Sequence, residues 1–310
     1  MVRHAIGIDL GGTSVKYAVV ASSGEVLFNG QLPALAQESS EAVLGQILKG
    51  VEACREYTAG GGLTLAGVGI GTPGVVSADG RTVLGGAENI AGWENVPLAD
   101  RIEQAAGLKT LAGNDADMMA LGETLFGAAK GASDVVFVTV GTGIGVLIGG
   151  RLFRGYRNRG MEMGHITVKC DGEACACGGR GCLEHYASTA ALVRRFCELS
   201  GAGADGADGR EVVRLYKEGN PAAVQAMEEH WNYLAHGIAS MINLFAPQRV
   251  VVGGGISEAG DFYLAKLREG VRRQMMSVCG EDTELVAARL GNRAGCMGAA
   301  GLVLDKRQGR

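Results

Sequence analysis

Short glycine clusters follow apolar runs at three widely separated places in the chain. They are Gly11-Gly12 after residues 5–10, Gly141-Thr142-Gly143-Ile144-Gly145 after residues 135–140, and Gly253-Gly254-Gly255 after residues 249–252. Short apolar runs bounded by glycine are typical of buried β-strands that end in turns. Because glycine has no Cβ, the backbone N–H groups of such turns can approach a ligand closely. The pattern predicts an α/β protein with ligand-binding turns at its strand ends.

The arrangement of strand, glycine turn and strand occurs twice, at residues 5–20 and 135–148, which suggests two structurally similar halves. We expect strands at residues 5–10, 15–20, 25–32, 65–70, 109–112, 135–140 and 249–252, and helices at residues 39–57, 98–107, 116–129, 210–218, 221–228, 230–245 and from 298 onward. The length of 310 residues favours about two domains. We expect a smaller α/β domain at residues 1–112, joined by a C-terminal helix at 298–310, and a larger one at 113–297.

Charge and cysteine content exclude several classes of protein. The formal net charge is −4 and charged residues make up 20% of the chain, which argues against nucleic acid or an anionic membrane as a partner. The N-terminus lacks the apolar region of a signal peptide, and no apolar run is long enough to span a membrane. The eight cysteines lie in a chain much longer than a typical disulfide-stapled secreted domain. We therefore expect a cytoplasmic protein.

The first glycine cluster belongs to the sequence Asp9-Leu10-Gly11-Gly12-Thr13. Backbone N–H groups at the two glycines could point at a phosphate, and the Thr13 hydroxyl could add a donor. Asp9 could hold Mg²⁺ through water, because Mg²⁺ prefers carboxylate and phosphate oxygens. The alternative is a tight hairpin without a ligand.

The second cluster, at residues 141–145, lacks the Lys-Ser/Thr pair of a P-loop, and a strand is expected after it rather than a helix. These features exclude both the P-loop and the dinucleotide-binding turn. For the third cluster, at residues 253–255, the alternative is close packing where a helix begins. Arg151, Arg154, Arg157 and Arg159 form a basic cluster that we expect to be a solvated hairpin.

Asn114-Asp115 stands where a short strand gives way to a helix. A carboxylate at such a junction projects from the sheet edge where ligands gather in open α/β folds. Asp115 could there take a proton from a hydroxyl that attacks a phosphate. The alternative is a simple helix N-cap. Asp117 is a less favourable base, because two positions along a helix it faces another direction.

Three thiols surround a glycine turn in Cys175-Ala176-Cys177-Gly178-Gly179-Arg180-Gly181-Cys182-Leu183-Glu184, and His165 lies ten residues earlier. Three cysteines and one histidine make a closed tetrahedral zinc set. The alternatives are a redox pair, for which C-x-C is a short spacing, or unlinked buried thiols.

These motifs together resemble the ROK family of sugar kinases and repressors, which carries E-x-G-H followed by C-x-C-G-x-x-G-C-x-E. The match extends over nearly the whole chain. It includes residues 9–13, Gly71-Thr72-Pro73-Gly74, Asn89 with Gly92-Trp93, Asn114-Asp115, Leu290-Gly291-Asn292 and Gly298-Ala299-Ala300. The resemblance implies an actin-like (ribonuclease H-like) ATPase fold, in which two α/β domains surround a central cleft. It also implies a homodimer.

The resemblance implies roles for particular residues. Asp115 would be the catalytic base, Glu162, His165 and Glu184 would contact sugar hydroxyls, and Asn89 and Asn114 would assist. His165, Cys175, Cys177 and Cys182 would bind Zn²⁺. ATP with Mg²⁺ would be bound by Asp9, Gly11, Gly12, Thr13, Lys16, Gly141, Thr142, Gly143, Gly254 and Gly255. Met161 and Met163 depart from the family pattern around Glu162.

The function expected from this resemblance is ATP-dependent phosphorylation of a hexose, with glucose giving glucose 6-phosphate. N-acetylmannosamine, N-acetylglucosamine, allose, fructose and β-glucosides are alternative substrates within the family. Repressors of the family carry a helix-turn-helix domain before the kinase-like part. This chain begins almost at its first phosphate motif, so we expect no repressor. A non-catalytic sugar sensor is a further alternative, against which Asp9, Thr13 and Asp115 argue.

Overall fold

The protein is described by a computed structural model that covers residues 2–141, 143–201 and 207–308. Its first sheet has the strand order β3-β2-β1-β4-β7. The strands are β1 (His4–Leu10), β2 (Ser14–Ala21), β3 (Val26–Pro33), β4 (Leu65–Thr72) and β7 (Thr110–Asn114). The first three form the expected antiparallel meander, whereas β4 and β7 run parallel to β1. The carboxyl ends of β1, β4 and β7 therefore lie at one edge of the sheet.

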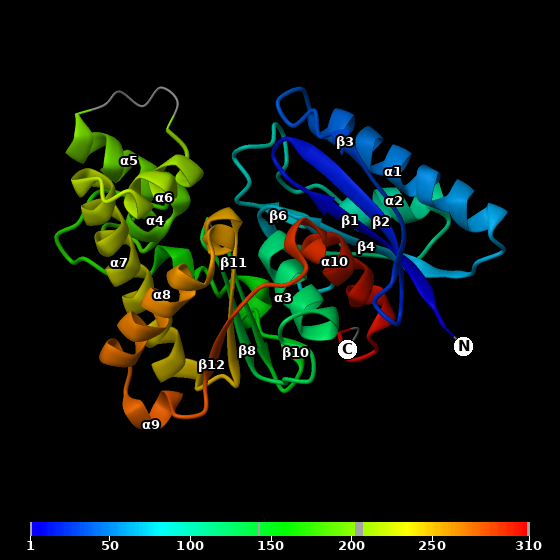
Figure 1. Cartoon of the computed structure of the whole chain (residues 1–310). Coiled ribbons are helices and arrows are strands. Elements are labelled where there is room, and N and C mark those ends of the chain that lie inside the picture. The colour runs from blue at the N-terminus through cyan, green and yellow to red at the C-terminus, as the bar shows by residue number, and fades with distance from the viewer. Residues whose placement is uncertain (1, 142, 202–206, 309–310) are drawn as a thin grey trace. The chain divides into compact units, whose positions relative to one another are not determined.

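Helices cover both faces of this sheet (Figure 1). Ile6 and Ile8 of β1 pack in one core with α1 (Ser40–Gly60) and α2 (Leu98–Ala106). Ala5, which points to the other face because side chains alternate along a strand, packs with α10 (Ala294–Leu304). Helix α3 (Asp115–Phe126) packs against α10. The residues beside Asp115 are thus held between a sheet and a buried helix.

Glycine lets α10 approach its neighbours at backbone distance. A Cβ on Gly69 of β4 would lie 1.7 Å from the carbonyl oxygen of Ala299, and one on Gly298 would lie 1.6 Å from that of Met118. No side chain fits at either position. Part of the high glycine content therefore serves packing between elements, and not only the approach of a ligand.

The second sheet has the strand order β10-β9-β8-β11-β12. Its strands are β8 (Val135–Thr139), β9 (Ile144–Ile148), β10 (Arg151–Leu152), β11 (Arg249–Gly253) and β12 (Glu284–Ala287). Strands β8, β11 and β12 are parallel, so the turns that follow β8 and β11 lie at the same sheet edge. Strands β5 (Val75–Val76) and β6 (Val83–Gly85) form a separate antiparallel pair.

The remaining helices differ in part from those expected. They are α4 (Glu184–Ala187), α5 (Thr189–Ser200), α6 (Gly209–Lys217), α7 (Pro221–Phe245), α8 (Asp261–Gln274) and α9 (Ser277–Gly280), with 3₁₀ turns at Tyr156–Asn158, Met163–His165, Gly255–Ala259 and Gly291–Arg293. The two helices expected at 221–228 and 230–245 are one continuous helix, α7. Its break was predicted wrongly, because His230 and Trp231 continue the buried face of the helix rather than ending it. Helices α5 and α8 and strand β12 were not expected.

The chain forms two compact units. The first comprises Met1–Ser133, Gly145–Met161 and Arg289–Arg310, and the second comprises Asp134–Ile144 and Glu162–Ala288. The first unit extends beyond residue 112, where we placed the domain boundary, because α3 packs against α10 and so belongs with the first sheet.

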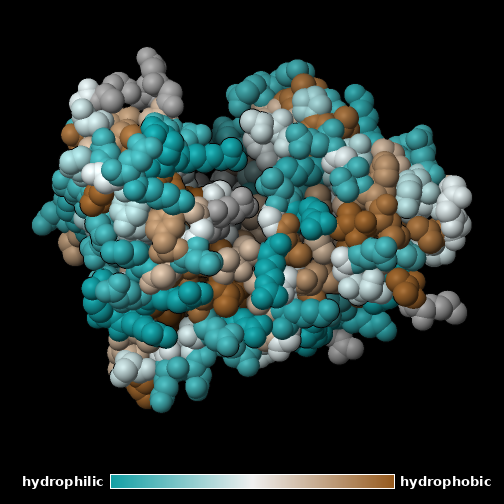
Figure 2. Space-filling model, in the orientation of Figure 1, coloured by the Kyte–Doolittle hydropathy of each residue, from teal (hydrophilic) through white to brown (hydrophobic). Residues whose placement is uncertain are grey.

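Hydrophobic and hydrophilic residues alternate over the visible face of the protein (Figure 2). In Figure 2, hydrophobic residues stand in scattered groups among hydrophilic ones on the visible face. Among the described residues, no helix combines the length and the apolar content that crossing a bilayer requires. All eight cysteines are free thiols.

Candidate functional site

The junction between β7 and α3 holds the carboxylate singled out by the sequence. Asn114 is the N-cap of α3, and its Oδ1 accepts hydrogen bonds from the backbone N–H groups of Ala116 (2.9 Å) and Asp117 (3.3 Å). Its Nδ2 donates to the carbonyl oxygen of Gly74 at 3.1 Å. Both ends of the Asn114 amide are therefore engaged within the protein. The capping role and the carboxylate belong to adjacent residues, so the simple N-cap reading applies to Asn114 rather than to Asp115.

Asp115 is the first residue of α3 and is half-buried. Its Oδ1 accepts a hydrogen bond from the N–H group of Ala116 at 2.9 Å, and it makes no ion pair with any described residue. Burial raises the pKa of Asp115, and its backbone hydrogen bonds offset only part of this rise. Asp115 is therefore a carboxylate with increased proton affinity and no counter-ion in the part of the chain that the structure describes.

Asp9 is a second buried carboxylate in the same unit. It stands opposite Lys16 in the β1–β2 ladder, with its Oδ2 3.8 Å from Lys16 Nζ. Burial raises the pKa of Asp9 to about 6; Lys16 opposes this rise and the charge of Asp115 adds to it. The two carboxylates are thus close enough to influence each other electrostatically.

The carboxylate of Asp9 lies against the first turn of α10. A Cβ on Gly295 would lie 2.5 Å from Asp9 Cγ, so only glycine leaves space for the carboxylate there. A buried, anionic oxygen pair beside the phosphate-type turn is the donor chemistry that Mg²⁺ requires. The residues present therefore fit a hydrated Mg²⁺ at Asp9.

The turn that joins β1 to β2 contains Gly11, Gly12 and Thr13. Gly11 N–H donates to the carbonyl oxygen of Ser14 at 2.9 Å, whereas Gly12 and Thr13 are exposed. Asn89 Nδ2 lies 3.0 Å from the position that a Cβ on Gly12 would occupy. The structure thus brings Asn89, which is 77 positions away in the sequence, to the first glycine turn.

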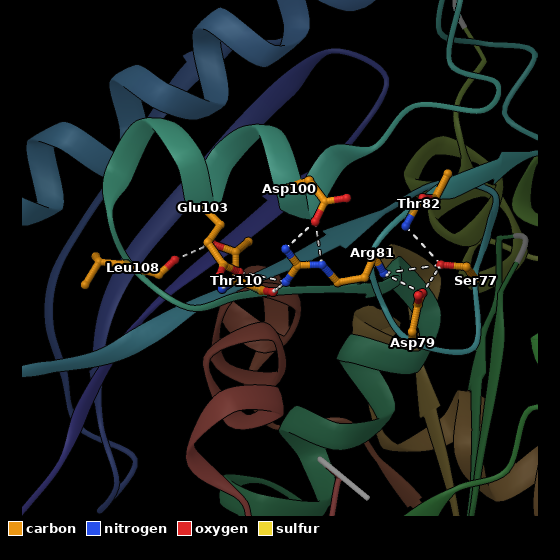
Figure 3. A network of polar contacts seen from close by, with 8 residues as sticks. All are labelled: Ser77, Asp79, Arg81, Thr82, Asp100, Glu103, Leu108 and Thr110. Carbon is orange, nitrogen blue, oxygen red and sulfur yellow. Dashed lines mark hydrogen bonds and ion pairs between the residues drawn. The ribbon is translucent and has the colours of Figure 1, made fainter.

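A polar network supports the strand that leads to Asp115. Figure 3 shows the Arg81 guanidinium between Asp100 and Glu103 of α2 and the carbonyl oxygen of Thr110, the first residue of β7. Its Nη1 lies 2.7 Å from Glu103 Oε2 and 2.9 Å from the Thr110 oxygen. The network fixes the start of β7 and was not expected from the sequence.

The turn after β4 is fixed by Trp93, one of the residues that matched the family pattern. Its Nε1 donates to Thr72 Oγ1 at 2.8 Å, and both residues are buried. This hydrogen bond holds the turn whose Gly74 carbonyl oxygen receives Asn114 Nδ2. The Gly71–Gly74 motif therefore supports the β7–α3 junction from the side of β4.

The second unit contains the expected metal-ligand cluster. The ligand atoms of His165, Cys175, Cys177 and Cys182 all lie within 4.8 Å of one another. Cys175 Sγ is 3.7 Å from His165 Nδ1, and Cys177 Sγ is 3.6 Å from Cys182 Sγ. A backbone hydrogen bond from Gly179 lowers the pKa of the Cys177 thiol. Three thiols and one imidazole at these distances fit a tetrahedral zinc ion.

One carboxylate lies beside this cluster, and a second precedes His165 in the chain. Glu184 begins α4, and its Oε2 lies 3.8 Å from His165 Nε2, the ring nitrogen that faces away from the thiols. Glu162 is exposed and precedes the 3₁₀ turn that contains His165. Met163 is buried, whereas Met161 has a φ of 72°, a conformation that favours glycine. The two methionines therefore affect the site differently, Met163 through packing and Met161 through backbone strain.

The other two glycine clusters meet in the second unit. Val140 N–H donates to the Gly253 carbonyl oxygen at 2.9 Å, so the turns after β8 and β11 lie side by side. Gly254 and Gly255 are exposed. Gly141 and Gly143 line a small cavity of about 20 Å³ together with Gly164 and Glu184. Thr142, which we also expected to bind nucleotide, lies outside the described residues.

One buried ion pair was missed by the sequence analysis. Arg154 Nε lies 2.7 Å from Asp117 Oδ2, and the two side chains are 19% and 8% exposed. The expectation of a solvated arginine hairpin is wrong for Arg154, whereas Arg151, Arg157 and Arg159 are exposed. No local signal could have indicated the pair, since its members are 37 positions apart.

Known proteins resemble this chain over almost its full length. The ROK family profile matches residues 5–306. The chain is 35% identical over 317 residues to a glucokinase of Streptomyces coelicolor, covering 97% of each chain. It is 30% identical over 316 residues to a xylose repressor of Caldicellulosiruptor bescii, covering 98% of this chain and 79% of that one. The crystal structure of a ROK family glucokinase from Streptomyces griseus in complex with glucose and AMPPNP has a TM-score of 0.80 and 34% identity, covering 96% of this chain and 98% of that one.

Proposed function

Because the chain belongs to the ROK family, we propose that it is an ATP-dependent sugar kinase that transfers the γ-phosphate of ATP to a hexose hydroxyl. The similarity to a ROK family glucokinase structure over 96% of the chain confirms the expected actin-like α/β fold. The curated glucokinase relative and the structure with glucose and AMPPNP support a sugar and a nucleotide as the two substrates.

The observation that carries this proposal is the state of Asp115. Among the three neighbouring aspartates of the first unit, Asp9 faces Lys16 and Asp117 faces Arg154, whereas Asp115 makes no ion pair with any described residue. A carboxylate with a raised pKa and no counter-ion is suited to accept a proton. In the proposed reaction, Asp115 accepts the proton of the sugar hydroxyl while the hydroxyl oxygen attacks the γ-phosphorus atom. The bond between that phosphorus and the bridging oxygen of ADP breaks, and ADP leaves with the electron pair.

The glycine turns supply binding groups for the phosphates. The backbone N–H group of Gly12, with the Thr13 hydroxyl, would orient the phosphates in the first unit, and Lys16 would add a positive charge. The expected role of Gly11 is to shape this turn, because its N–H group is bonded to the carbonyl oxygen of Ser14. Gly141, Gly143, Gly254 and Gly255 would hold the nucleotide in the second unit. Asp9 would hold hydrated Mg²⁺, which neutralises charge on the phosphates when bound. These groups would orient ATP and offset its charge, while Asp115 accepts the proton of the sugar hydroxyl.

The cysteine cluster is proposed as a structural zinc site. His165, Cys175, Cys177 and Cys182 supply four ligands, which leaves no open position for a substrate or water. His165 would bind through Nδ1, since this atom faces Cys175, and its Nε2 is directed towards Glu184. The metal would thereby fix the His165 ring and the start of α4. The proposed sugar-binding role of Glu162, His165 and Glu184 would then depend on a folded zinc loop.

Glucose is the proposed substrate, with phosphorylation at the 6-hydroxyl. The curated relative at 35% identity is a glucokinase, and the carboxylates of Glu162 and Glu184 suit a ligand that presents several hydroxyl donors. Asn89 would assist from beside Gly12, and the Asn114 amide would act by holding the junction at Asp115. N-acetylmannosamine, N-acetylglucosamine, allose, fructose and β-glucosides are the alternatives for the same chemistry.

A coupled assay of ADP release over this panel of sugars tests the proposal. We expect ATP-dependent turnover that requires Mg²⁺, with the highest kcat/KM for glucose, and a product whose mass increases by one phosphate. A higher kcat/KM for another sugar would identify that sugar as the substrate and leave the assignment as a kinase unchanged.

The xylose repressor relative makes sugar binding without turnover the second candidate function. Calorimetric binding of a sugar without ADP release from any of them would favour it.

A further inference from the structure

Arg154 occupies an unusual position for a residue on a short connecting segment. It follows β10, yet its side chain is only 19% exposed and forms the 2.7 Å ion pair with Asp117 in the first turn of α3. Asp117 is 8% exposed, so both charges are largely removed from water. Such a pair gains little net stability, because desolvation offsets the attraction between the charges. Its value lies in the geometry that it imposes.

Nη2 of the Arg154 guanidinium lies against Gly113, the residue before the β7–α3 junction. Nη2 is 3.2 Å from the position that a Cβ on Gly113 would occupy, and Met118 Cε is 2.7 Å from the same position. Gly113 immediately precedes Asn114-Asp115, so any larger residue there would displace the guanidinium or Met118. Nη2 itself is buried and has no hydrogen-bond partner among the described residues. Arg154 therefore reaches both sides of the proposed base, at Gly113 and at Asp117.

The segment that carries Arg154 is itself anchored. Asn158 Nδ2 donates to the carbonyl oxygen of Ser77 at 3.2 Å, and the Ser77 side chain accepts hydrogen bonds from the backbone at Arg81 and Thr82. This loop is the one that Figure 3 shows bound to β7 through the Arg81 side chain. The segment that carries Arg154 is thus anchored by contacts outside α3, so the Arg154 side chain can fix the position of the first turn of α3.

We propose that Arg154 is a positioning residue for Asp115. By binding Asp117 and packing under Gly113, it fixes the first turn of α3 and so the direction of the Asp115 carboxylate. It also neutralises Asp117, the adjacent buried aspartate, so that among the described residues Asp115 is the carboxylate of this turn without a counter-ion. The inference rests on the proposed function, in which Asp115 is the base.

The first test compares Arg154→Met with Arg157→Met in the full chain. Arg157 is an exposed arginine three residues later with no ion pair among the described residues, so its variant is a matched control for loss of one charge. A displacement of about 1 Å at a reacting group costs on the order of 10²-fold in rate. We expect Arg154→Met to lower kcat by about 10- to 100-fold while the KM for ATP changes less than about threefold. Arg157→Met should match the parent. A kcat for Arg154→Met within about twofold of the parent, measured on folded protein, overturns the proposal.

The double variant Arg154→Met/Asp117→Asn separates positioning from charge balance. It removes the charge of Asp117, whose ion pair Arg154→Met breaks, so it should recover the parent unfolding temperature more closely than the single variant does. We expect its kcat to stay low, because no side chain then braces Gly113 and α3. Recovery of the parent kcat would overturn the proposal. Arg154→Lys keeps the charge without the planar fork, so its kcat should be intermediate.

Hydrogen exchange of residues 113–120 provides a readout that needs no activity. The N–H groups of Ala116 and Asp117 are bonded to Asn114 Oδ1, and Arg154→Met should make them exchange at least tenfold faster. Arg157→Met should leave their exchange unchanged. If the parent phosphorylates no sugar, the proposed function fails. Faster exchange of the Ala116 and Asp117 N–H groups in Arg154→Met, but not in Arg157→Met, would still support the positioning role of Arg154. Unchanged exchange in Arg154→Met overturns it.

Discussion

Replacement of Asp9 by asparagine should stabilise the protein while abolishing its activity. Burial and the charge of Asp115 raise the pKa of Asp9 from an ordinary value of 3.8 to about 6, so the folded protein holds this proton more tightly than the unfolded chain does. Stability therefore falls as the pH rises from about 4 to about 6, and the loss persists above this range. At about 1.4 kcal/mol per pH unit, the ionised carboxylate costs about 3 kcal/mol at pH 8. An asparagine resembles the protonated form and avoids this cost.

Thermal unfolding at pH 8 and at pH 4 tests this reasoning. Asp9→Asn should unfold several degrees above the parent at pH 8, because about 3 kcal/mol shifts the midpoint of a chain of this size by that much. The two proteins should unfold within about a degree of each other at pH 4, where Asp9 is protonated in the folded state and partly protonated in the unfolded chain, so most of the cost is absent. Asp282→Asn, which changes an exposed aspartate, is the matched control and should have no effect at either pH. A lower midpoint for Asp9→Asn at pH 8 would refute the account of Asp9 as a destabilising buried charge.

Three further outcomes follow from the site. Elemental analysis should find one zinc per chain, and Cys182→Ser should lose the metal and unfold at a lower temperature, since Cys182 is the buried ligand; full activity without zinc would contradict this. Glucose should exceed 2-deoxyglucose in kcat/KM by roughly tenfold, because an acceptor that the bound sugar covers costs about 1 kcal/mol or more when its hydroxyl is missing; equal values would argue against paired hydroxyl recognition. The value of kcat/KM should decline as the pH falls through about 6, where Asp9 takes up a proton; a rate that is flat down to pH 5 would show that Asp9 need not be ionised.

The sequence was most informative where function depends on residues that are close together in the chain. The turn at Gly11-Gly12 and the capped start of α3 depend on local backbone chemistry, which residue types alone indicate. The cysteine cluster was equally predictable, because its ligands fall within residues 165–182. The structure brings their ligand atoms within 4.8 Å of one another. Helix α8 was missed although Leu264, Leu267 and Val271 repeat at a helical spacing and are buried.

The remainder depends on contacts between distant residues. Arg154 was assigned to a solvated hairpin, because nothing near it in the chain indicates a buried partner 37 positions away. The packing role of Gly298 and Gly69 was not predicted, because both lie at crossings that only the folded arrangement defines. Likewise, the pKa of Asp9 depends on burial and on Asp115, which is on another strand end. Tertiary packing, rather than local propensity, decides each of these features.

The rate of phosphate transfer by Asp115→Asn tests the central claim most directly. The asparagine side chain can still donate and accept hydrogen bonds but cannot take a proton from the sugar hydroxyl. With glucose and ATP, kcat should fall by about 10²- to 10⁴-fold while calorimetry gives a glucose Kd close to that of the parent. A variant that binds glucose and retains more than about a tenth of the parent kcat would contradict the assignment of Asp115 as the base.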